Sequence, residues 1–273
     1  MDELIITVGI TGSRITREQT AAIPITPAEI AASGIEAWRA GASVLHVHVR
    51  DPLTQLGTQD VELFRQVVDR LRAETDAIVC LTTSGIPGRN FSTEERIAPL
   101  GLRPDMASFD AGSVNTPAGV FLNEPDFLEA LAAEARLRGV KLELECFDTG
   151  MVATCLRYLE QGVLDHPPHF QFVLGTAYGM PATAAALLHL TGMLPTDATW
   201  SVIGIGRAQL PMTTLATIIG GHARVGLEDN LYYRKGEPAE SNAQLVERTV
   251  RIAGELGRPV ATPAEARRIL SLS

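Results

Sequence analysis

The sequence lacks the features that mark secreted or disulfide-bonded proteins. Its 273 residues include only three cysteines, Cys80, Cys146 and Cys155, and an odd number without paired spacing does not form a disulfide framework. Such thiols are typical of reduced proteins of the cytoplasm. The segment at 1–10, MDELIITVGI, also lacks the basic flank and the small-residue cleavage site of a signal peptide. We therefore predict a cytoplasmic protein whose cysteines stay reduced.

Long apolar runs and clusters of positive charge are also missing. No apolar stretch approaches the roughly 18 residues that a membrane-spanning helix requires, so we expect no membrane partner. The net charge is -9, and Lys and Arg form no run, whereas nucleic-acid binding requires a clustered basic face. Nucleic acid is therefore not an expected partner. An anionic cofactor could still bind to a few local positive groups.

What the sequence does contain is a regular alternation of strand-like and helix-like segments. Hydrophobic residues make up 45% of the chain and charged residues 20%, a balance that allows a large buried core. Segments rich in Val and Ile alternate with helical segments, which is the pattern of successive βα units. Eight candidate strands lie near residues 4–10, 43–49, 77–83, 105–109, 141–147, 169–174, 199–204 and 223–227.

Eight βα units fit one closed barrel better than an open sheet. Such barrels run to roughly 250 residues as a single unit, and no linker or composition shift divides the chain. We predict one domain over residues 1–273, a single (β/α)8 TIM barrel with extra helices at its C-terminus. The helical segment at 93–98, which Pro99 cuts short, is the weakest part of this prediction.

The stretch LHVHVRDP at 45–52 places two histidines in an apolar strand. His46 and His48 are two residues apart, so both imidazoles lie on the same face, which can be the barrel lumen. Active sites of these barrels lie at the C-terminal strand ends, and Glu228 ends the eighth candidate strand. The three residues form a two-histidine, one-carboxylate set suited to zinc or another first-row metal. The alternative is two hydrogen-bonded core histidines and a loop-capping carboxylate.

Other strand ends are polar as well. Asp229 could act as a general base if Arg224 orients it, although an Arg–Asp pair is equally common as a structural ion pair. The segment at 81–85, LTTSG, offers hydroxyls for a substrate carboxylate, or else forms a simple turn. Ser108 adds a hydroxyl. Glu145, on one face with Glu143, is costly in a strand unless it is paired, which favours a role in a site.

Several segments together form a specific pattern. They are ITGS at 10–13, PITPAE at 24–29, AGASVLHVHVRD at 40–51, FVLG at 172–175, GIGR at 204–207, GGHARVGLEDN at 220–230, Lys235-Gly236 and ESNAQLV at 240–246. With them the chain resembles, over essentially its whole length, the β-keto acid cleavage enzymes, which are zinc-dependent barrels. The HxHxR motif combined with the distant Glu228-Asp229-Asn230 ending is more specific than either motif alone.

The resemblance implies a retro-Claisen-type reaction in which a β-keto acid and acetyl-CoA give acetoacetate and a new acyl-CoA. By the same resemblance, His46, His48 and Glu228 would bind Zn²⁺ or another divalent first-row metal, which would polarise the β-carbonyl. Asp229, oriented by Arg224, would generate the carbon nucleophile from acetyl-CoA.

The resemblance also implies how the two substrates bind. Thr82 falls where the family places a hydroxyl on the carboxylate of the keto acid, and Ser108 falls at a second hydroxyl position. Glu145 matches a family acid near the substrate tail, with Glu143 as the alternative match. The loops after the sixth and seventh strands, including Arg207, would receive CoA. A homo-oligomer, with a tetramer as the expected form, is implied too.

Arg14 departs from the family pattern. Some members carry a glutamate there that recognises an ammonium group on the substrate tail, which an arginine would repel. If Arg14 faces the pocket, it could bind a second carboxylate, as in a dicarboxylic β-keto acid such as 3-oxoadipate. It could instead pair with Glu145 or Asp110, which favours an uncharged tail, or it could lie outside the pocket.

Two alternatives remain open. An amidohydrolase-type hydrolase also uses HxH and a carboxylate of the eighth strand, but it places HxH on the first strand and further histidines at the ends of the fifth and sixth. Here the fifth strand ends at Cys146 and His169 begins the sixth. The other alternative is a barrel without catalytic activity that binds a ligand or serves in assembly, which would require the polar strand ends to be accidental.

Overall fold

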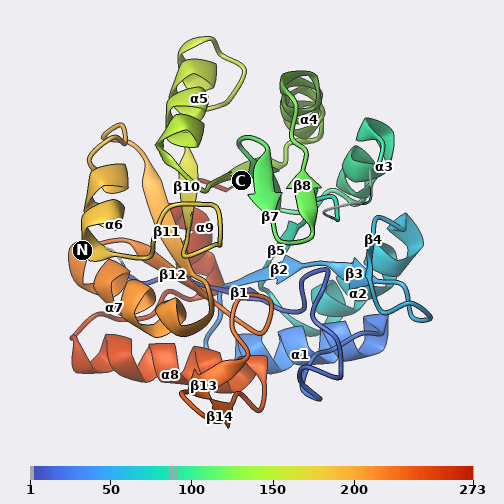
Figure 1. The fold of residues 1–273 in the computed structure, drawn as a ribbon, viewed down its shortest axis with the longest axis vertical. Coiled ribbons are helices and arrows are strands. Elements are labelled where there is room, and N and C mark those ends of the chain that lie inside the picture. The colour runs from blue at the N-terminus through green and yellow to red at the C-terminus, as the bar shows by residue number, and fades with distance from the viewer. Residues whose placement is uncertain (1–2, 87–88, 90, 273) are drawn as a thin grey trace.

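A closed barrel of eight parallel strands forms the centre of the molecule (Figure 1). The structure, a computed structural model, describes residues 3–86, 89 and 91–272. In the order around the barrel, the strands are β1 (Ile6–Gly9), β12 (His222–Val225), β11 (Thr199–Gly204), β10 (His169–Leu174), β9 (Lys141–Cys146), β6 (Met106–Asp110), β5 (Ile78–Leu81) and β2 (Val44–Val47). Each candidate strand of the sequence contains or overlaps one of these, so the predicted barrel is confirmed.

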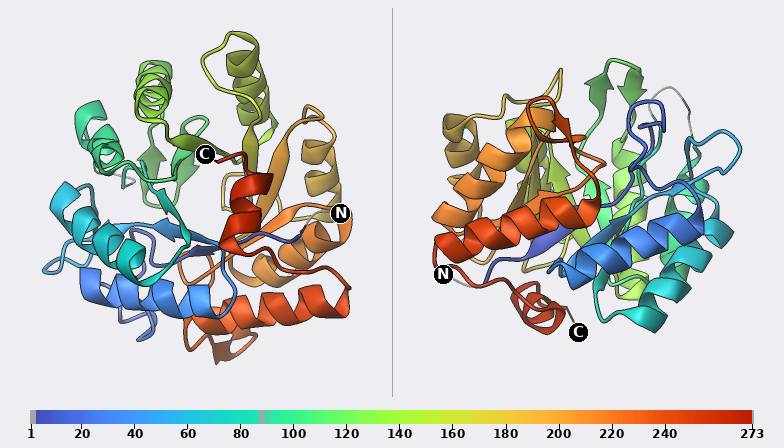
Figure 2. Two further views of the ribbon diagram at one scale, coloured as in Figure 1. Left: turned by 180° about the vertical axis from the view of Figure 1, so that it is seen from behind. Right: turned by 90° about the horizontal axis from the view of Figure 1, so that it is seen from below.

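Helices surround the barrel on the outside (Figure 2). They are α1 (Pro27–Arg39), α2 (Val61–Glu74), α3 (Thr93–Ile97), α4 (Pro125–Arg138), α5 (Thr149–Glu160), α6 (Ala184–Thr191), α7 (Gln209–Ile219), α8 (Asn242–Glu255) and α9 (Pro263–Ile269). Two 3-10 helices, η1 (Ala98–Leu102) and η2 (Gly206–Ala208), follow α3 and β11. Pro99 lies in η1, and the short α3 still fills the third helical position. In the described part of the chain, no helix is long and apolar enough to cross a membrane.

Alternation along each strand separates the helix-facing core from the lumen. In β2, Leu45 and Val47 pack into the hydrophobic cluster shared with the helices, whereas His46 lies between them on the opposite face. Burial of such aliphatic side chains contributes roughly 1.5–3 kcal/mol each. The lumen is therefore free to carry polar groups without weakening the main core.

The last helix closes one end of the barrel. Ala266 and Leu270 pack against Ile5, Val44 and Ile78 at the N-terminal strand ends, and Figure 2 shows α9 across that side of the barrel. Helix α8 completes the eighth βα unit, so α9 is the additional helix beyond the barrel. Only the C-terminal strand ends are left to open toward solvent.

Three hairpins that the sequence did not reveal extend from C-terminal strand ends. They pair β3 (Val49–Arg50) with β4 (Gly57–Thr58), β7 (Val114–Thr116) with β8 (Gly119–Phe121), and β13 (Tyr232–Arg234) with β14 (Glu237–Pro238). Their strands are only two or three residues long, too short for a periodic signal. They shape the rim of the barrel mouth.

Candidate active site

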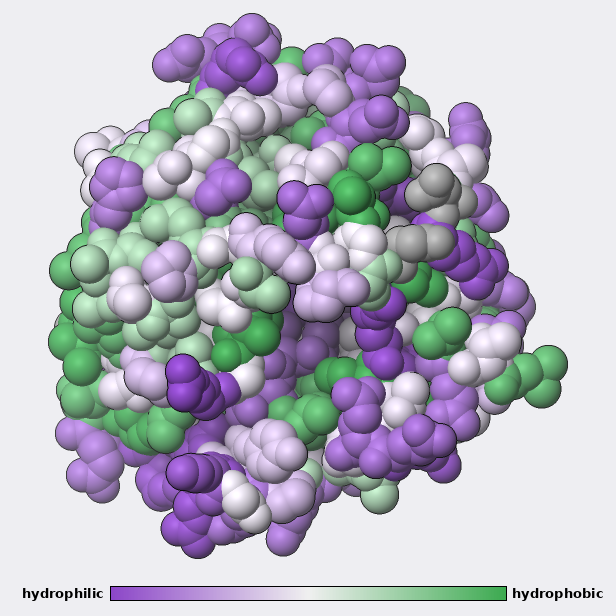
Figure 3. Space-filling view, viewed as in Figure 1, coloured by the Kyte–Doolittle hydropathy of each residue, from purple (hydrophilic) through white to green (hydrophobic). Residues whose placement is uncertain are grey.

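A cavity of about 260 Å³ opens at the C-terminal end of the barrel. Figure 3 shows this face, with hydrophilic side chains inside a central hollow. Polar lining residues are Ser13, Arg14, His46, His48, Ser84, Asp110, Glu145, Thr176, Arg224, Glu228 and Asp229. Apolar lining residues are Ile15, Phe121, Phe147, Val173, Ile203 and Ile205. Most of the charged residues singled out in the sequence therefore share one cavity.

The two histidines of the HxH motif face this cavity together. Their ring centroids are 5.1 Å apart, and the Nε2 atoms of His46 and His48 lie 3.8 and 3.2 Å from Glu228 Oε1. Ligand atoms of all three residues lie within 4.8 Å of one another. The predicted two-histidine, one-carboxylate arrangement is thus present as a geometric cluster.

Glu228 reaches the histidines from a loop rather than from a strand. The β12 ladder ends at Val225, and Gly226 follows with φ +139°, a backbone conformation that favours glycine. A Cβ at Gly226 would lie 2.1 Å from the Gly9 oxygen, and one at Gly12 would lie 2.8 Å from Glu228 Cγ. Close backbone packing with the end of β1 therefore fixes the position of Glu228.

The electrostatics of the cluster suit a cation. Burial disfavours ionisation of Glu228, but His48, Arg224 and His46 outweigh it and hold the pKa of Glu228 well below its usual range. Burial, followed by Arg224, lowers the pKa of His46, so its imidazole is neutral, as a metal ligand must be. The buried Oε2 of Glu228 has no hydrogen-bond partner among the described residues. An ionised carboxylate with one unpartnered oxygen, beside two imidazoles, is compatible with a bound divalent ion.

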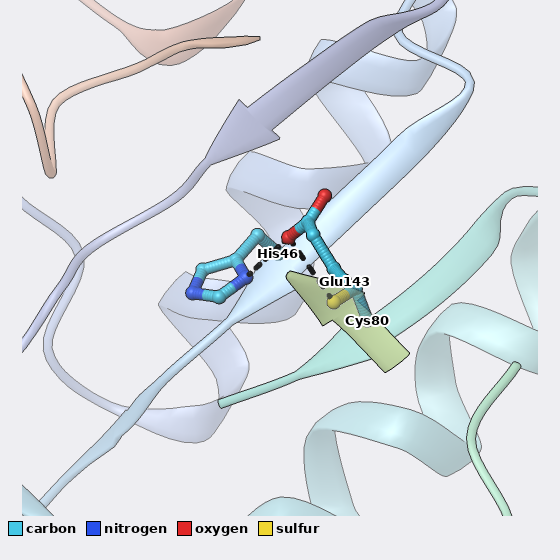
Figure 4. A group of neighbouring side chains, drawn as sticks. All are labelled: His46, Cys80 and Glu143. Carbon is cyan, nitrogen blue, oxygen red and sulfur yellow. Dashed lines mark hydrogen bonds and ion pairs between the residues drawn. The ribbon is translucent and has the colours of Figure 1, made fainter. Parts of the chain in front are cut away.

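A second cluster lies on the other side of His46 (Figure 4). Glu143 Oε1 lies 3.8 Å from His46 Nδ1, and the Cys80 thiol donates to the same oxygen at 3.7 Å. Burial and Glu143 raise the pKa of Cys80 well above its usual value, so the thiolate form that binds metals is disfavoured. We therefore favour the cluster with His48 and Glu228, which borders the cavity.

Arg224 links the carboxylates around the cavity. Its Nε donates to Asp229 Oδ2 at 3.1 Å, and its terminal nitrogens donate to Glu228 Oε1 at 2.8 Å, Glu145 Oε1 at 3.4 Å and Gln171 Oε1 at 3.0 Å. Asp229 and Glu228 outweigh burial and keep the pKa of Arg224 well above its usual value. The predicted pair of Arg224 and Asp229 is therefore part of a larger network.

Asp229 combines an orienting partner with a raised pKa. Burial raises the pKa of Asp229 to about 6, although Arg224 opposes this shift. A carboxylate whose pKa lies near neutrality can both accept and return a proton at physiological pH. Asp229 is therefore the candidate general base of the cavity.

Both glutamates of β9 point into the barrel. Glu143 and Glu145 are buried, and burial raises the pKa of Glu143 to about 7. Burial and the neighbouring Asp110 raise the pKa of Glu145 well above its usual range. Of the two glutamates, Glu145 borders the cavity and Glu143 lies beneath it against His46.

The two predicted hydroxyl residues lie behind the cavity wall. Thr82 Oγ1 accepts a hydrogen bond from the Ser84 amide at 3.0 Å, and Ser108 Oγ accepts from the Thr83 amide at 3.0 Å. Both residues are buried. The segment at 81–85 borders the cavity through Ser84 and Gly85. Their predicted roles on substrate stay predictions.

Arg14 borders the cavity from the loop after β1. Its side chain is exposed, and the residue lines the cavity together with the two histidines of the HxH motif. The loop is held by Arg50, whose guanidinium donates to the backbone oxygens of Thr11, Ile15 and, at 2.9 Å, Gln55. The arginine of the HxHxR motif therefore anchors the loop that carries Arg14.

Arg207 lies outside this first cavity. It follows β11 and lines a separate cavity of about 700 Å³ beside the β13–β14 hairpin. Gly206, next to it, donates a backbone hydrogen bond to the Asp229 oxygen at 2.8 Å. This hydrogen bond joins the loop that carries Arg207, the predicted CoA contact, to the loop that carries Asp229.

Comparison with known proteins agrees with this geometry. A family model described as beta-keto acid cleavage enzyme matches residues 3–272. The chain belongs to the β-keto acid cleavage enzyme family. It is 44% identical over 274 residues to "3-keto-5-aminohexanoate cleavage enzyme" of Fusobacterium nucleatum, covering 100% of this chain and 99% of that protein. It is 40% identical over 271 residues to "3-oxoadipate:acetyl-CoA acetyltransferase" of Cupriavidus necator, covering 98% of this chain and 94% of that protein.

A solved structure supports the fold. The ternary complex of ObcA with a C4-CoA adduct and oxalate superimposes with a TM-score of 0.79 at 22% identity, covering 92% of this chain and 68% of that chain. Membership of this family favours a β-keto acid cleavage enzyme over an amidohydrolase-type hydrolase and over a barrel without catalytic activity.

The sequence did not predict that Gln171 and Cys80 contact the charged residues of the site. Gln171 connects Arg224 to Glu143 and Ser201 through hydrogen bonds of 2.9–3.0 Å, and Cys80 contacts Glu143. Gln171 has the same parity as His169 in β10, so alternation alone could have placed it in the lumen. No pattern within β10 indicated its partners, because they lie on three other strands.

Proposed function

We propose that the protein cleaves a β-keto acid with acetyl-CoA, giving acetoacetate and a new acyl-CoA. The observation that carries this proposal is that the cluster of His46, His48 and Glu228 shares one cavity with the Arg224–Asp229 pair in a member of this family. The metal cluster and the base therefore lie side by side in one cavity, because Glu228 and Asp229 both contact Arg224, and a single substrate could contact both.

The metal would be Zn²⁺ or another divalent first-row ion held by His46, His48 and Glu228. Neutral imidazoles and an ionised carboxylate suit such ions. When bound, the ion would polarise the substrate carbonyl and stabilise negative charge on its oxygen. The chain itself supplies the orientation of the ligands and the proton transfer.

The products define which bonds form. Acetoacetate would contain the carboxylate and C2 of the keto acid joined to the acetyl group of acetyl-CoA. Asp229 would therefore remove a proton from C2, and this carbon would attack the thioester carbonyl and expel CoA thiolate. The origin of the carbon atoms in acetoacetate therefore makes C2 of the keto acid the nucleophile. From the sequence we had expected the nucleophile to be the acetyl carbon of acetyl-CoA.

The second half of the reaction returns the proton. The thiolate would add to the original β-carbonyl, and the bond from that carbon to C2 would break. The acyl group would leave as acyl-CoA, and Asp229 would return its proton to C2 to give acetoacetate. Arg224 would hold Asp229 in place during both transfers through its hydrogen bonds at 3.1 and 3.5 Å.

The substrate tail would be anionic or uncharged rather than an ammonium group. Arg14 borders the cavity and would repel a cation, while Phe121 and Phe147 offer apolar contacts for a hydrocarbon segment. A dicarboxylic keto acid would place its second carboxylate near Arg14. Glu145 would contribute to the tail site as a neutral acid, in keeping with its raised pKa.

The carboxylate next to C2 would bind at the end of β5. We assign Thr82 and Ser108 to this subsite, where both are buried and each hydroxyl accepts a backbone hydrogen bond from the segment that borders the cavity. Within the segment at 81–85, Ser84 lines the cavity, and its Oγ donates to Asp110 Oδ2 at 3.2 Å.

We also propose a cytoplasmic homo-oligomer, with a tetramer as the expected form. Helices α6 and α7 contain no charged Asp, Glu, Lys or Arg, and Leu188, Ile218 and Ile219 expose 36–53% of their surface there. Figure 3 shows an extended apolar area over these helices. Sedimentation equilibrium would test this, and a monomer at micromolar concentration would contradict it.

A coupled assay tests the proposed reaction. The purified, zinc-loaded protein is incubated with acetyl-CoA and a panel of β-keto acids with anionic, neutral and ammonium tails, and acetoacetate and acyl-CoA are measured. We expect turnover with anionic or neutral tails. Absence of turnover across the panel, with metal bound, would refute the proposed function.

A further inference from the structure

Gln171 is a fully buried polar residue of the barrel lumen, the third residue of β10. It is not one of the described residues that line the active-site cavity, so we do not expect it to contact substrate. A buried amide costs free energy unless both of its ends are hydrogen-bonded. In this chain both ends are, and their partners lead to the two halves of the candidate active site.

The two ends of the amide have different partners. Gln171 Oε1 accepts a hydrogen bond from Arg224 Nη1 at 3.0 Å. Gln171 Nε2 donates to Glu143 Oε2 at 2.9 Å and to Ser201 Oγ at 3.0 Å. A guanidinium group can only donate, so the amide oxygen must face Arg224 and the amide nitrogen must face Glu143. The surroundings therefore allow one orientation of this amide.

The amide oxygen leads to the proposed base. Arg224 Nη1 donates to Gln171, and Arg224 Nε donates to Asp229 Oδ2 at 3.1 Å. Glu145 accepts from the same Nη1 at the longer distance of 3.4 Å. A guanidinium group is planar and rigid, so fixing one of its nitrogens restrains the direction of the others. Gln171 therefore restrains the group that orients Asp229.

The amide nitrogen leads to a proposed metal ligand. Glu143 accepts from Gln171 through Oε2, while its Oε1 lies 3.8 Å from His46 Nδ1 (Figure 4). This Nδ1 is buried and has no hydrogen-bond partner among the described residues. A carboxylate beside the free nitrogen of a metal-binding histidine orients the ring. Holding Glu143 in place is therefore a way of orienting His46.

The chemistry of the amide explains why a glutamine suits this position. An amide can accept from Arg224 and donate to Glu143 at the same time. An ionised glutamate can only accept, and a leucine can neither accept nor donate. These two substitutions therefore separate the hydrogen bonds of Gln171 from the space that its side chain fills.

We propose that Gln171 is a positioning residue shared by the two halves of the active site. Its amide oxygen fixes Arg224, which orients Asp229. Its amide nitrogen fixes Glu143, which orients His46. The proposal rests on the proposed function, from which the roles of the base and the metal ligand are taken, and adds the residue that connects them.

Gln171→Leu removes both connections. We expect the dissociation constant for Zn²⁺, measured by competition with a chromophoric chelator, to rise about 10–100-fold, the usual effect of losing support for a ligating histidine. With the protein saturated with Zn²⁺, kcat should fall about tenfold to a hundredfold, because a displaced catalytic group is costly. KM for the keto acid should stay close to that of the parent protein, since Gln171 does not line the cavity.

Gln171→Glu keeps the acceptor for Arg224 and loses the donor to Glu143. We expect its kcat to exceed that of Gln171→Leu, although a carboxylate is less favourable than leucine in a buried lumen. A residue that only filled space would give the opposite order. A kcat for Gln171→Glu at or below that of Gln171→Leu would overturn the connection to Arg224.

Ser201→Ala is the matched control, because it removes the third hydrogen bond of the Gln171 amide and leaves the other two. Its zinc affinity and kcat should stay close to those of the parent protein. Equal losses in Ser201→Ala and Gln171→Leu would show a general disturbance of the lumen and overturn the proposal.

Zinc affinity also separates this proposal from the proposed function. If the zinc-bound parent protein turns over no keto acid, the proposed function fails, and the dissociation constant for Zn²⁺ then decides the role of Gln171. A value in Gln171→Leu equal to that of the parent protein would refute this role.

Discussion

His46 has a different carboxylate next to each of its ring nitrogens. Nε2 faces Glu228 beside the cavity and Nδ1 faces Glu143 beneath it, both at 3.8 Å. A carboxylate near the nitrogen that does not bind metal fixes the tautomer and the orientation of a ligating histidine. The sequence motif thus predicts a candidate metal ligand, whereas the second carboxylate, Glu143, comes from another strand deeper in the barrel.

Metal binding and proton transfer should separate by mutation. We expect His46→Ala to lose bound metal and to lower kcat/KM by at least about a thousandfold, because a Lewis acid contributes several kcal/mol. Asp229→Asn should keep the metal and lower kcat by roughly 10²–10⁴-fold, the usual contribution of a general base. Metal content by mass spectrometry and steady-state assays measure both. Full activity in a metal-free His46→Ala protein would refute the assignment.

Arg14 should determine the preferred charge of the substrate tail. Because it borders the cavity, Arg14→Glu should favour ammonium-tailed over carboxylate-tailed keto acids by about tenfold to a hundredfold relative to the parent protein. The ratio of kcat/KM values for such a pair is the measurement. Arg39→Glu, an exposed charge reversal on α1, is the matched control. An unchanged ratio in Arg14→Glu would show that the tail binds elsewhere.

At the scale of elements, the loop after β1 depends on the β3–β4 hairpin. Arg50 lies in β3 and is fully buried, and it donates to three backbone oxygens that hold the loop at 11–15 and Gln55. The backbone of Gly57 in β4 also donates to the Ser13 oxygen at 2.9 Å. The same loop packs Gly12 against Glu228, so the hairpin positions both the proposed tail site and a proposed metal ligand.

Arg50→Lys should loosen this loop. A lysine cannot donate in the same fork, so we expect the free energy of unfolding to fall by about 2–4 kcal/mol, since hydrogen bonds from charged groups contribute roughly 1.5–3 kcal/mol each. Discrimination between tails should also fall several-fold. Urea unfolding and the panel assay measure these effects. A stability loss with tail discrimination intact would mean that the loop does not position the tail site.

At the scale of the whole molecule, buried histidines at the closed end of the barrel tie stability to pH. His222 Nδ1 accepts a hydrogen bond from the Ile5 amide at 3.1 Å, and burial followed by Arg258 lowers its pKa from 6.5 to about 3. Burial also lowers the pKa of His169, whose ring centre is 6.3 Å from that of His222. Both imidazoles are neutral in the folded chain and become protonated more readily when the chain unfolds.

Acid should therefore destabilise the fold before general acid denaturation. Between pH 6.5 and about 3 the unfolded chain binds the extra proton at His222, so stability falls as the pH falls, by up to about 1.4 kcal/mol per pH unit. Urea unfolding at pH 7.5, 6 and 5 measures the slope. His222→Asn should reduce the slope, whereas His189→Gln, at an exposed position of α6, should not. Equal slopes in all three proteins would contradict this origin.

The sequence by itself determined the barrel and most of the charged residues of the candidate site. The alternation of Val and Ile located all eight strands, and the two-residue spacing of His46 and His48 placed both imidazoles on one face, because strand geometry fixes these properties locally. The expectation that Glu228 ends a strand was less accurate, since β12 stops at Val225 and the turn at Gly226 brings the carboxylate into place.

Only the tertiary structure decided which groups meet. Glu143, Gln171 and Cys80 lie on three different strands. Closure of the barrel brings Glu143 to His46 and Cys80, and Gln171 to Arg224. The cavity that Arg207 lines likewise lies between segments that are far apart along the chain. Periodicity is a property of one segment at a time, whereas burial, pKa shifts and cavities depend on distances between segments, and these exist only in the folded molecule.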